Sequence, residues 1–234
     1  MPQNTAKLTR HTQLTNDVFE LTFETENRLK FAAGQFITIK IEDKNQPCFR
    51  AYSICSAPQK NNNKFDICIK LIKDGRGSNW LNNLQIGEKI NFIGPTGKFT
   101  FKETAKDVLF IATGTGIAPF KSMLEDSPSG SPKNKITLLW GLRNTESIFY
   151  KKFLNKIKEK HENFSFTITL SDQENNIKWQ GETGRVTDFL LKTKIDSKNT
   201  ETYLCGLKEM IEEVSAILQK KGLSKEAIHF EQYD

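Results

Sequence analysis

Apolar side chains occupy every second position in several short segments of the first hundred residues. Phe19, Leu21 and Phe23 form one such segment, and similar alternation runs through residues 37–41 and 65–71, with polar residues between. A period of two predicts antiparallel strands that have one face in a core and one in water. Turn signals separate these strands at residues 33–34, 43–47, 61–63, 74–75 and 94–97. Short strands at this spacing predict a small β-barrel.

From about Thr104 the pattern changes. Residues 108–112 and 136–140 are continuous apolar runs, which parallel strands buried on both faces require. Apolar residues at helical spacing follow in residues 147–160 and 207–221. Because strands and helices alternate, we expect a doubly wound parallel sheet in this half of the chain.

The composition fits two folded domains. The chain has 234 residues, of which 37% are hydrophobic, so it is too apolar for a disordered protein. We expect a barrel domain at residues 1–103 and an α/β domain at residues 104–234. No apolar run approaches the roughly 20 residues of a membrane span, and the first residues lack the apolar segment of a secretory signal. A cytoplasmic protein is therefore expected.

The cysteines and the net charge narrow the class of protein further. Cys48, Cys55, Cys68 and Cys205 are spaced too irregularly for a zinc site or an iron–sulfur cluster, so no metal is expected. The net charge is +6, and residues 1–103 hold 15 Lys and Arg against 10 Asp and Glu. Single lysines interleaved with acidic residues are not typical of nucleic-acid binding. They fit a face that docks an acidic protein better.

Three segments carry candidate phosphate-binding chemistry. Residues 113–119, TGTGIAP, follow a buried strand directly, and a glycine turn before a helix offers backbone N–H groups to a diphosphate. Residues 50–53, RAYS, place an arginine that can pair with phosphate near a tyrosine that can stack on a flat ring. Residues 75–81, GRGSNWL, suit a phosphate nest. Taken alone, each segment also has a structural interpretation, as a tight turn or as packing residues.

Two further segments lie near strand ends in the second half. Residues 203–206, YLCG, end a predicted late strand at the sheet edge where open α/β sheets bind ligands. A lone cysteine there is also typical of a small buried core residue. Residues 229–234, HFEQYD, alternate as a final strand would, which by itself indicates only an edge strand.

The order of these motifs resembles the ferredoxin–NADP reductase superfamily. Six motifs follow one another: R-x-Y-S at 50–53, G-x-x-S-N-x-L at 75–81, G-P-x-G-x-F at 94–99, G-T-G-I-A-P at 114–119, C-G at 205–206 and H-x-E-x-Y at 229–233. The resemblance covers residues 31 to 233, nearly the whole chain. It implies an antiparallel FAD-binding β-barrel followed by a doubly wound parallel-sheet NAD(P)-binding domain. It also implies an enzyme that transfers hydride between NAD(P)H and FAD and exchanges electrons with a ferredoxin, a flavodoxin or an oxygenase component.

The resemblance places FAD along the barrel. Arg50 would hold the diphosphate, Tyr52 would stack on the isoalloxazine ring, and Ser53 would hydrogen-bond near its N5 atom. Backbone groups of residues 68–70 would face the flavin nucleotide. The residues implied to bind FAD are Arg50, Ala51, Tyr52, Ser53, Cys68, Ile69, Lys70, Arg76, Gly77, Ser78 and Tyr233.

The same resemblance places NAD(P)H on the second domain. Thr115 and Cys205 would flank the nicotinamide, Glu231 matches a near-terminal carboxylate, and Tyr233 matches an aromatic ring that covers the flavin until nicotinamide displaces it. Here Asp234 follows that ring, a departure from the family that would alter its stacking. The residues implied to bind NAD(P) are Gly114, Thr115, Gly116, Pro119, Arg143, Asp172, Cys205 and Gly206, and the implied catalytic residues are Ser53, Cys205, Glu231 and Tyr233.

The choice between NADH and NADPH stays open in the sequence. NADP-specific relatives commonly carry an arginine where this chain has Asp172, and a carboxylate there would accept a ribose hydroxyl and repel a 2′-phosphate. Arg143 could instead reach a phosphate, and one charged hydrogen bond is worth about 1.5–3 kcal/mol. The two effects are comparable, with NADH slightly favoured.

Two other interpretations are weighed against the enzyme. A non-catalytic flavoprotein, acting as an electron-transfer or binding subunit of a larger complex, would carry the same FAD motifs. The presence of Cys205, Glu231 and Tyr233 together favours the enzyme. A basic nucleic-acid-binding protein is the third interpretation, and it would show salt-sensitive DNA binding and no flavin absorbance.

Overall fold

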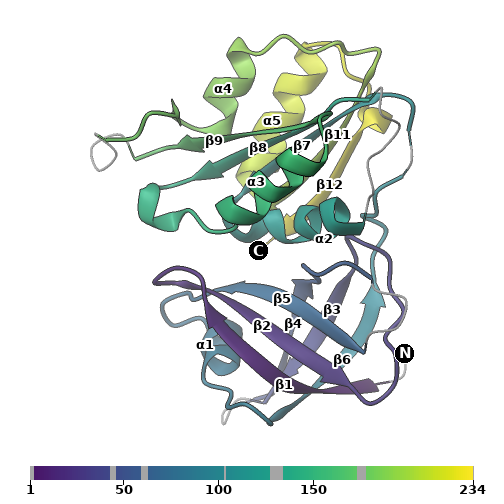
Figure 1. Ribbon diagram of the computed structural model, residues 1–234, viewed down its shortest axis with the longest axis vertical. Helices are drawn as coiled ribbons and strands as arrows, with labels where there is room; N and C mark the ends of the chain where they lie inside the picture. The colour runs from purple at the N-terminus through teal and green to yellow at the C-terminus, as the bar shows by residue number, and fades with distance from the viewer. Residues whose placement is uncertain are drawn as a thin grey trace. The chain divides into compact units, whose positions relative to one another are not determined.

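The computed structural model describes residues 3–42, 46–58, 63–102, 104–126, 134–172 and 178–233 (Figure 1). The chain forms two compact units. The first consists of Met1–Phe101 together with Ala118–Asp126, and the second consists of Lys102–Ile117 together with Ser127–Asp234. Helix α2 (Ala118–Asp126), which follows the glycine turn, thus packs with the first unit.

The first unit is built on an antiparallel sheet of six strands. They are β1 (Gln3–Gln13), β2 (Val18–Thr25), β3 (Phe36–Ile41), β4 (Cys48–Ser53), β5 (Lys64–Lys70) and β6 (Lys89–Thr96). Their order in the sheet is β4-β3-β6-β1-β2-β5. A single bridge between Ile54 and Ile67 joins the two edge strands, so the sheet curls into a barrel. Helix α1 (Arg76–Asn82) lies between β5 and β6 in the chain.

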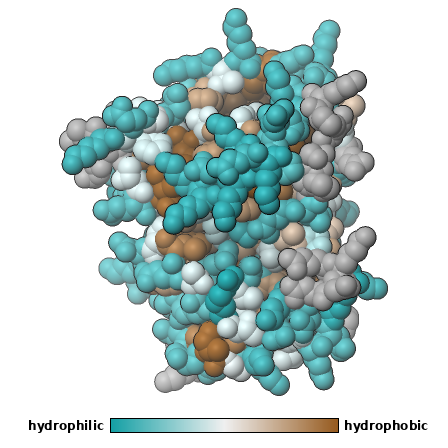
Figure 2. All heavy atoms as spheres, in the orientation of Figure 1, coloured by the Kyte–Doolittle hydropathy of each residue, from teal (hydrophilic) through white to brown (hydrophobic). Residues whose placement is uncertain are grey.

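Alternating residues fill the barrel, as their period of two predicts. Ile37, Ile39 and Ile41 of β3 are fully buried while the residues between them are half-buried. The rings of Phe23, Phe65 and Phe92 are in contact, with centroids 5.7 and 5.6 Å apart. Polar residues cover most of the face shown in Figure 2, with apolar residues in small separate areas.

One predicted turn is wrong. Residues 94–96 belong to the end of strand β6, and only Gly97 lies beyond it. The register between β3 and β6 shifts between Phe36 and Thr38, next to Gly94, which has a φ of +110°. A proline, which has no N–H to donate, is tolerated in a strand at such an irregularity. Of the turns predicted at residues 43–47 and 61–63, residues 43–45 and 61–62 lie outside the described residues.

The second unit is built on a parallel sheet of six strands. They are β7 (Asp107–Thr113), β8 (Ile136–Leu142), β9 (Phe164–Leu170), β10 (Glu182–Thr183), β11 (Thr200–Leu207) and β12 (Ile228–Tyr233). Their order is β10-β9-β8-β7-β11-β12, and all neighbours are parallel. Strands β8, β9 and β10 follow β7 in turn on one side of it, and β11 and β12 then lie on its other side. The order therefore reverses between β7 and β11, as in a doubly wound sheet.

Three α-helices cover this sheet. They are α3 (Lys151–Lys160), α4 (Val186–Lys192) and α5 (Lys208–Lys220). Short 3-10 turns follow β7 (η1, Gly114–Ile117), β8 (η2, Thr145–Ser147) and α5 (η3, Lys225–Ala227). Apolar residues of α4 and α5 pack in one cluster with Ile111, Leu139 and Leu204 of the strands. Helix α3 lies in front of the sheet in Figure 1 and α5 lies behind it. The predicted doubly wound architecture is thus confirmed.

The helix predicted over residues 147–160 begins later, at Lys151. The Asn144 side chain accepts hydrogen bonds from the N–H and hydroxyl of Ser147, at 3.1 and 2.7 Å, and so closes a separate 3-10 turn. Tyr150 then adopts a left-handed conformation with a φ of +53°, which interrupts any helix. Phe149 packs its ring edge-on against Trp140 at 4.9 Å instead of continuing the helical face.

Candidate functional site

Strand β4 and the start of helix α1 form one surface of the first unit. Arg50 is exposed on β4 and Tyr52 is half-buried. A Cβ added at Gly77 would lie 2.7 Å from the Tyr52 hydroxyl and 2.9 Å from Arg50 Cγ. Only a residue without a side chain allows α1 to begin so close to these two groups. The structure therefore brings two separate sequence motifs together.

The groups on this surface suit a diphosphate joined to a flat ring. The Arg50 guanidinium donates to the Phe49 carbonyl at 2.8 Å and remains exposed, so it is a cation that a ligand can reach near the start of α1. The buried Ser78 hydroxyl accepts a hydrogen bond from the Ile72 N–H at 3.1 Å, which holds the turn before the helix. Burial raises the pKa of Tyr52 to about 12, so its phenol is neutral at physiological pH. A cation, a glycine turn before a helix and a neutral aromatic ring fit FAD.

Strand β5 lies at the other edge of the same sheet. Its bridge to Ile54 is at Ile67, and residues 68–70 continue beyond this bridge. The side chains of Cys68 and Ile69 are buried, whereas Lys70 is exposed. Cys68 and Ile69 can therefore offer a ligand only their backbone groups, which is the role that the resemblance implies for them. Ser53 is buried at the end of β4, opposite Phe36 of β3.

A second site lies in the second unit, where the strand order reverses. The glycine turn η1 follows β7, and Cys205 and Gly206 lie near the end of the neighbouring strand β11. A Cβ added at Gly116 would collide with the backbone carbonyl of Cys205. One added at Gly206, which has a φ of +156°, would collide with the Thr113 hydroxyl. Open α/β sheets bind ligands at this position, outside the carboxyl ends of the strands.

Cys205, Glu231 and Tyr233 gather at the same edge. In the pairing of β11 with β12, Cys205 lies opposite Glu231 and Leu207 lies opposite Tyr233. Burial raises the pKa of the Cys205 thiol well above its ordinary value, the Glu231 carboxylate adds to this, and a hydrogen bond with Tyr233 acts in the opposite direction. The thiol is therefore protonated at neutral pH. The Cys205 side chain is fully buried, so in this structure the residue offers a ligand only its backbone groups, and it cannot act as a thiolate nucleophile.

Arg143 and Asp172 also lie close together. The sequence indicates opposite effects for them, because Asp172 favours NADH and Arg143 favours NADPH. Arg143 Nε lies 3.8 Å from Asp172 Oδ2, and the Asp172 N–H donates to the Arg143 carbonyl at 2.9 Å. The arginine side chain is 81% exposed and the aspartate side chain 18%. The carboxylate is thus the fixed member of the pair, and the guanidinium is the one that can move.

The residues implied to bind FAD lie in the first unit and those implied to bind NAD(P) lie in the second, with two exceptions. Pro119, implied to bind NAD(P), lies in α2 of the first unit, and Tyr233, implied to contact FAD, lies in β12 of the second. Sequence reasoning missed Trp140, whose buried indole N–H donates to the Gly114 carbonyl at 2.9 Å and holds the glycine turn. A tryptophan near the end of a buried strand is the signal that could have revealed it, because a buried indole N–H needs an acceptor.

Comparisons with known proteins cover both sites. Residues 5–101 match the family described as Oxidoreductase FAD-binding domain, and residues 110–216 match Oxidoreductase NAD-binding domain. Ferredoxin–NADP reductase B of Sorangium cellulosum (strain So ce56) is 30% identical over 239 residues, which cover 98% of this chain and 97% of that protein. A ferredoxin NADP+ reductase from Neisseria gonorrhoeae, solved with bound FAD and NADP, has a TM-score of 0.86 at 23% identity and covers 99% of both chains.

Other relatives are longer than this chain. It spans 51% of one component of the Na(+)-translocating NADH-quinone reductase of Marinomonas sp. (strain MWYL1), at 31% identity over 212 residues and 85% of this chain. It spans 59% of the anthranilate 1,2-dioxygenase electron transfer component of Acinetobacter baylyi (strain ATCC 33305 / BD413 / ADP1), at 28% identity over 207 residues and 88% of this chain. The chain thus covers about half the length of several relatives.

An FAD-binding barrel followed by an NAD-binding parallel sheet defines a flavin-dependent NAD(P)H oxidoreductase, with FAD and NAD(P)H as its cofactors. The chain belongs to the ferredoxin–NADP reductase superfamily. This confirms the family, the fold and the cofactors that the sequence implied. Among the described residues, no helix is long and apolar enough to cross a membrane, and no group of three His, Cys, Asp or Glu could hold a metal ion.

Proposed function

We propose that the protein takes electrons from NAD(P)H through FAD and delivers them to a separate acidic carrier, a ferredoxin, a flavodoxin or an oxygenase component. When bound, FAD accepts a hydride from NAD(P)H and releases its electrons singly. The observation that supports this best is the close packing of Gly116 on Cys205 at the point where the strand order reverses. That packing provides a nucleotide site next to a thiol, a carboxylate and an aromatic ring in a chain that also carries the FAD surface at Arg50 and Gly77.

In this proposal each residue positions a ring or a phosphate. Arg50, Arg76 and the turn at Gly77–Ser78 bind the FAD diphosphate, Tyr52 stacks on the flavin, and Ser53 hydrogen-bonds near N5. Ala51 and the backbone of residues 68–70 complete the contacts. For the nucleotide, residues 114–116, Pro119 and Gly206 bind the diphosphate side, and Thr115 and Cys205 flank the nicotinamide. Glu231 and Tyr233 close the site, and the Asp234 that follows lies outside the described residues.

The proposal extends to the domains and the location. We propose residues 1–103 as the FAD-binding domain, residues 104–234 as the NAD(P)-binding domain, from which helix α2 packs with the first unit, and the cytoplasm as the compartment. The alternative, a non-catalytic flavoprotein subunit, makes a different prediction. If neither NADH nor NADPH bleaches the flavin absorbance under anaerobic conditions, whereas dithionite does, the alternative is correct.

The acceptor is tested by steady-state reduction of a purified acidic ferredoxin and a flavodoxin. The first domain carries most of the net positive charge, so we expect the rate to fall several-fold as salt is raised. Lys73 is exposed beside the turn that leads into α1, and Lys73→Glu is expected to lower the carrier rate. Lys192→Glu, an equal charge change at an exposed residue of α4, serves as the control. Equal carrier rates at low and high salt would contradict docking by charge.

The coenzyme preference is expected to depend on Asp172. We propose that the wild-type protein prefers NADH, because the fixed carboxylate repels a 2′-phosphate and also holds Arg143. Asp172→Asn removes the repulsion and releases the guanidinium. Since one charged hydrogen bond is worth about 1.5–3 kcal/mol, the ratio of kcat/KM for NADPH to that for NADH should rise roughly tenfold or more. Glu159→Gln, at an exposed residue of α3, is the control, and an unchanged ratio in Asp172→Asn would refute the role of this pair.

A further inference from the structure

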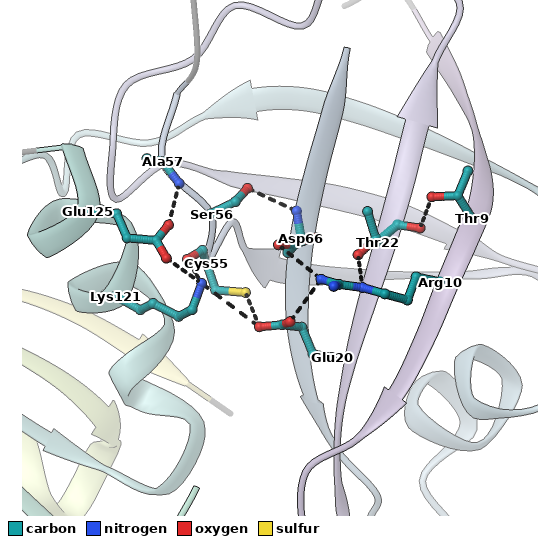
Figure 3. A network of polar contacts seen from close by, with 10 residues as sticks. All are labelled: Thr9, Arg10, Glu20, Thr22, Cys55, Ser56, Ala57, Asp66, Lys121 and Glu125. Carbon is teal, nitrogen blue, oxygen red and sulfur yellow. Dashed lines mark hydrogen bonds and ion pairs between the residues drawn. The ribbon is translucent and has the colours of Figure 1, made fainter. Parts of the chain in front are cut away.

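Helix α2 carries a buried lysine that neither cofactor site accounts for. Lys121 is only 7% exposed. Its ammonium donates to Glu125 Oε1 at 3.0 Å and to the Cys55 carbonyl at 3.2 Å, and it lies 3.9 Å from Glu20 Oε2 (Figure 3). Burial lowers the pKa of Lys121, but Cys55, Glu125 and Glu20 together outweigh burial and raise it. The ammonium is therefore charged and held between two carboxylates.

The carboxylates are themselves tied to the barrel. Glu20, on β2, pairs through Oε1 with Arg10 of β1 at 3.3 Å, and Arg10 also lies 3.9 Å from Asp66 of β5 (Figure 3). Glu125, on α2 itself, accepts a hydrogen bond from the Ala57 N–H at 3.0 Å. The lysine thus closes a network that joins α2 to three barrel strands and to the segment that follows β4.

Apolar packing alone would hold the helix on the barrel. Phe120 and Met123 are almost completely buried, and the Phe120 ring lies 5.8 Å from that of Phe99. Apolar packing is non-directional, however, and allows a helix to rotate or slide. Ion pairs and hydrogen bonds from one side chain to named atoms fix a single placement. The Ser122 hydroxyl, which donates to the Ser56 carbonyl at 2.6 Å, adds a second fixed point beside the lysine.

The placement of α2 matters because the glycine turn directly precedes it in the chain. The glycine turn ends at Ile117 and α2 begins at Ala118, so the chain passes from the second unit into the first at this peptide bond. Lys121 lies one helical turn beyond that point. The buried network therefore fixes, on the FAD-binding unit, the residue to which the nucleotide-binding turn is joined.

We propose that Lys121 is a positioning residue for hydride transfer. It fixes on the barrel the start of α2, the residue to which the glycine turn is joined. The proposal rests on the function proposed above. Hydride transfer requires the two rings at near-contact, and a misplacement of about 1 Å can cost about a hundredfold in rate. A lysine that only stabilises the fold would not affect the stacking of the rings.

The test compares the wild-type holoprotein with Lys121→Met. We expect similar FAD content and reduction by dithionite at the wild-type rate, but flavin reduction at saturating NAD(P)H at least about tenfold slower in stopped-flow measurements. The long-wavelength charge-transfer absorbance of stacked nicotinamide and flavin should weaken. Hydrogen exchange at the amides of residues 118–126 should become faster. Lys121→Arg, which keeps the charge, should restore most of the rate.

Two further variants change paired charges in the protein. Glu125→Gln removes one carboxylate from the ammonium and gives a milder change if Lys121→Met does not fold; we expect the same slower reduction. Lys106→Met removes another paired lysine, 3.0 Å from Glu201, and should leave flavin reduction at the wild-type rate.

Failure of the positioning role and failure of the proposed function give different results. Wild-type reduction and charge-transfer absorbance in folded Lys121→Met or Glu125→Gln would overturn the positioning role alone. A higher KM at unchanged kcat would also overturn it, because the lysine would then act on nucleotide binding. A wild-type protein that neither NADH nor NADPH reduces would overturn both proposals together.

Discussion

Gly116→Ala is expected to lower the rate of flavin reduction by NAD(P)H by about a hundredfold or more while the protein keeps its FAD. The added methyl group would collide with the backbone carbonyl of Cys205, which cannot rotate away as a flexible side chain could. The glycine turn must therefore move away from β11, and displacements of about 1 Å at a reacting centre have effects of this size. Stopped-flow absorbance of the flavin, with FAD content measured in parallel, provides the test.

Gly114→Ala is the matched comparison for this prediction. Gly114 lies in the same turn with a φ of +54°, and a Cβ there would meet nothing within 4 Å. The Gly114→Ala substitution therefore causes backbone strain of about 1–2 kcal/mol but no collision. We expect a clearly smaller loss of rate than in Gly116→Ala. Equal rates in the two variants would show that close packing against Cys205 has no part in the reaction.

Arg50→Ala is expected to weaken FAD binding by between roughly ten- and a hundredfold. The guanidinium is exposed beside Tyr52 and the start of α1, where a charged hydrogen bond to phosphate contributes about 1.5–3 kcal/mol. The dissociation constant is measured by fluorescence titration of the flavin-free protein with FAD. Because Arg50 is exposed, the flavin-free variant should unfold at nearly the temperature of the flavin-free wild-type protein.

Arg28→Ala tests whether any arginine of the barrel would have this effect. Arg28 is exposed in the same unit and precedes β3 in the chain. Its loss removes the same charge from the protein as a whole, so a change in FAD affinity from long-range charge alone would appear in both variants. Unchanged FAD affinity in Arg50→Ala, or an equal loss in both, would reject a direct contact with the diphosphate.

The local patterns of the sequence were sufficient for the fold class. Strands β3 and β7 were predicted because alternation and continuous apolar runs are short-range signals of how many faces a strand buries. The start of α3 was missed because Asn144 and Tyr150 override a good helical period with a cap and a left-handed backbone. Helix propensity and hydrophobic period do not predict such side-chain hydrogen bonds.

The sequence predicted those parts of the candidate site in which neighbouring residues of one motif supply the binding groups. Glycine turns and the Arg50 motif were found because their chemistry is local. Lys121 was not found, because at its position in α2 it looks like a surface lysine. Its partners Glu20 and Cys55 are distant in sequence, and only folding places them around it. The Arg143–Asp172 pair is similar: each residue was noticed, but their contact was not.

The division of the chain into units has a practical consequence for anyone who dissects this protein. Because α2 belongs with the barrel but lies in the chain after β7, no single cut yields both units intact. A fragment that stops at residue 101 would lose the helix that covers Phe99 and would leave Glu20 facing water without its lysine. An independently expressed barrel therefore needs residues 118–126 grafted back through a designed linker.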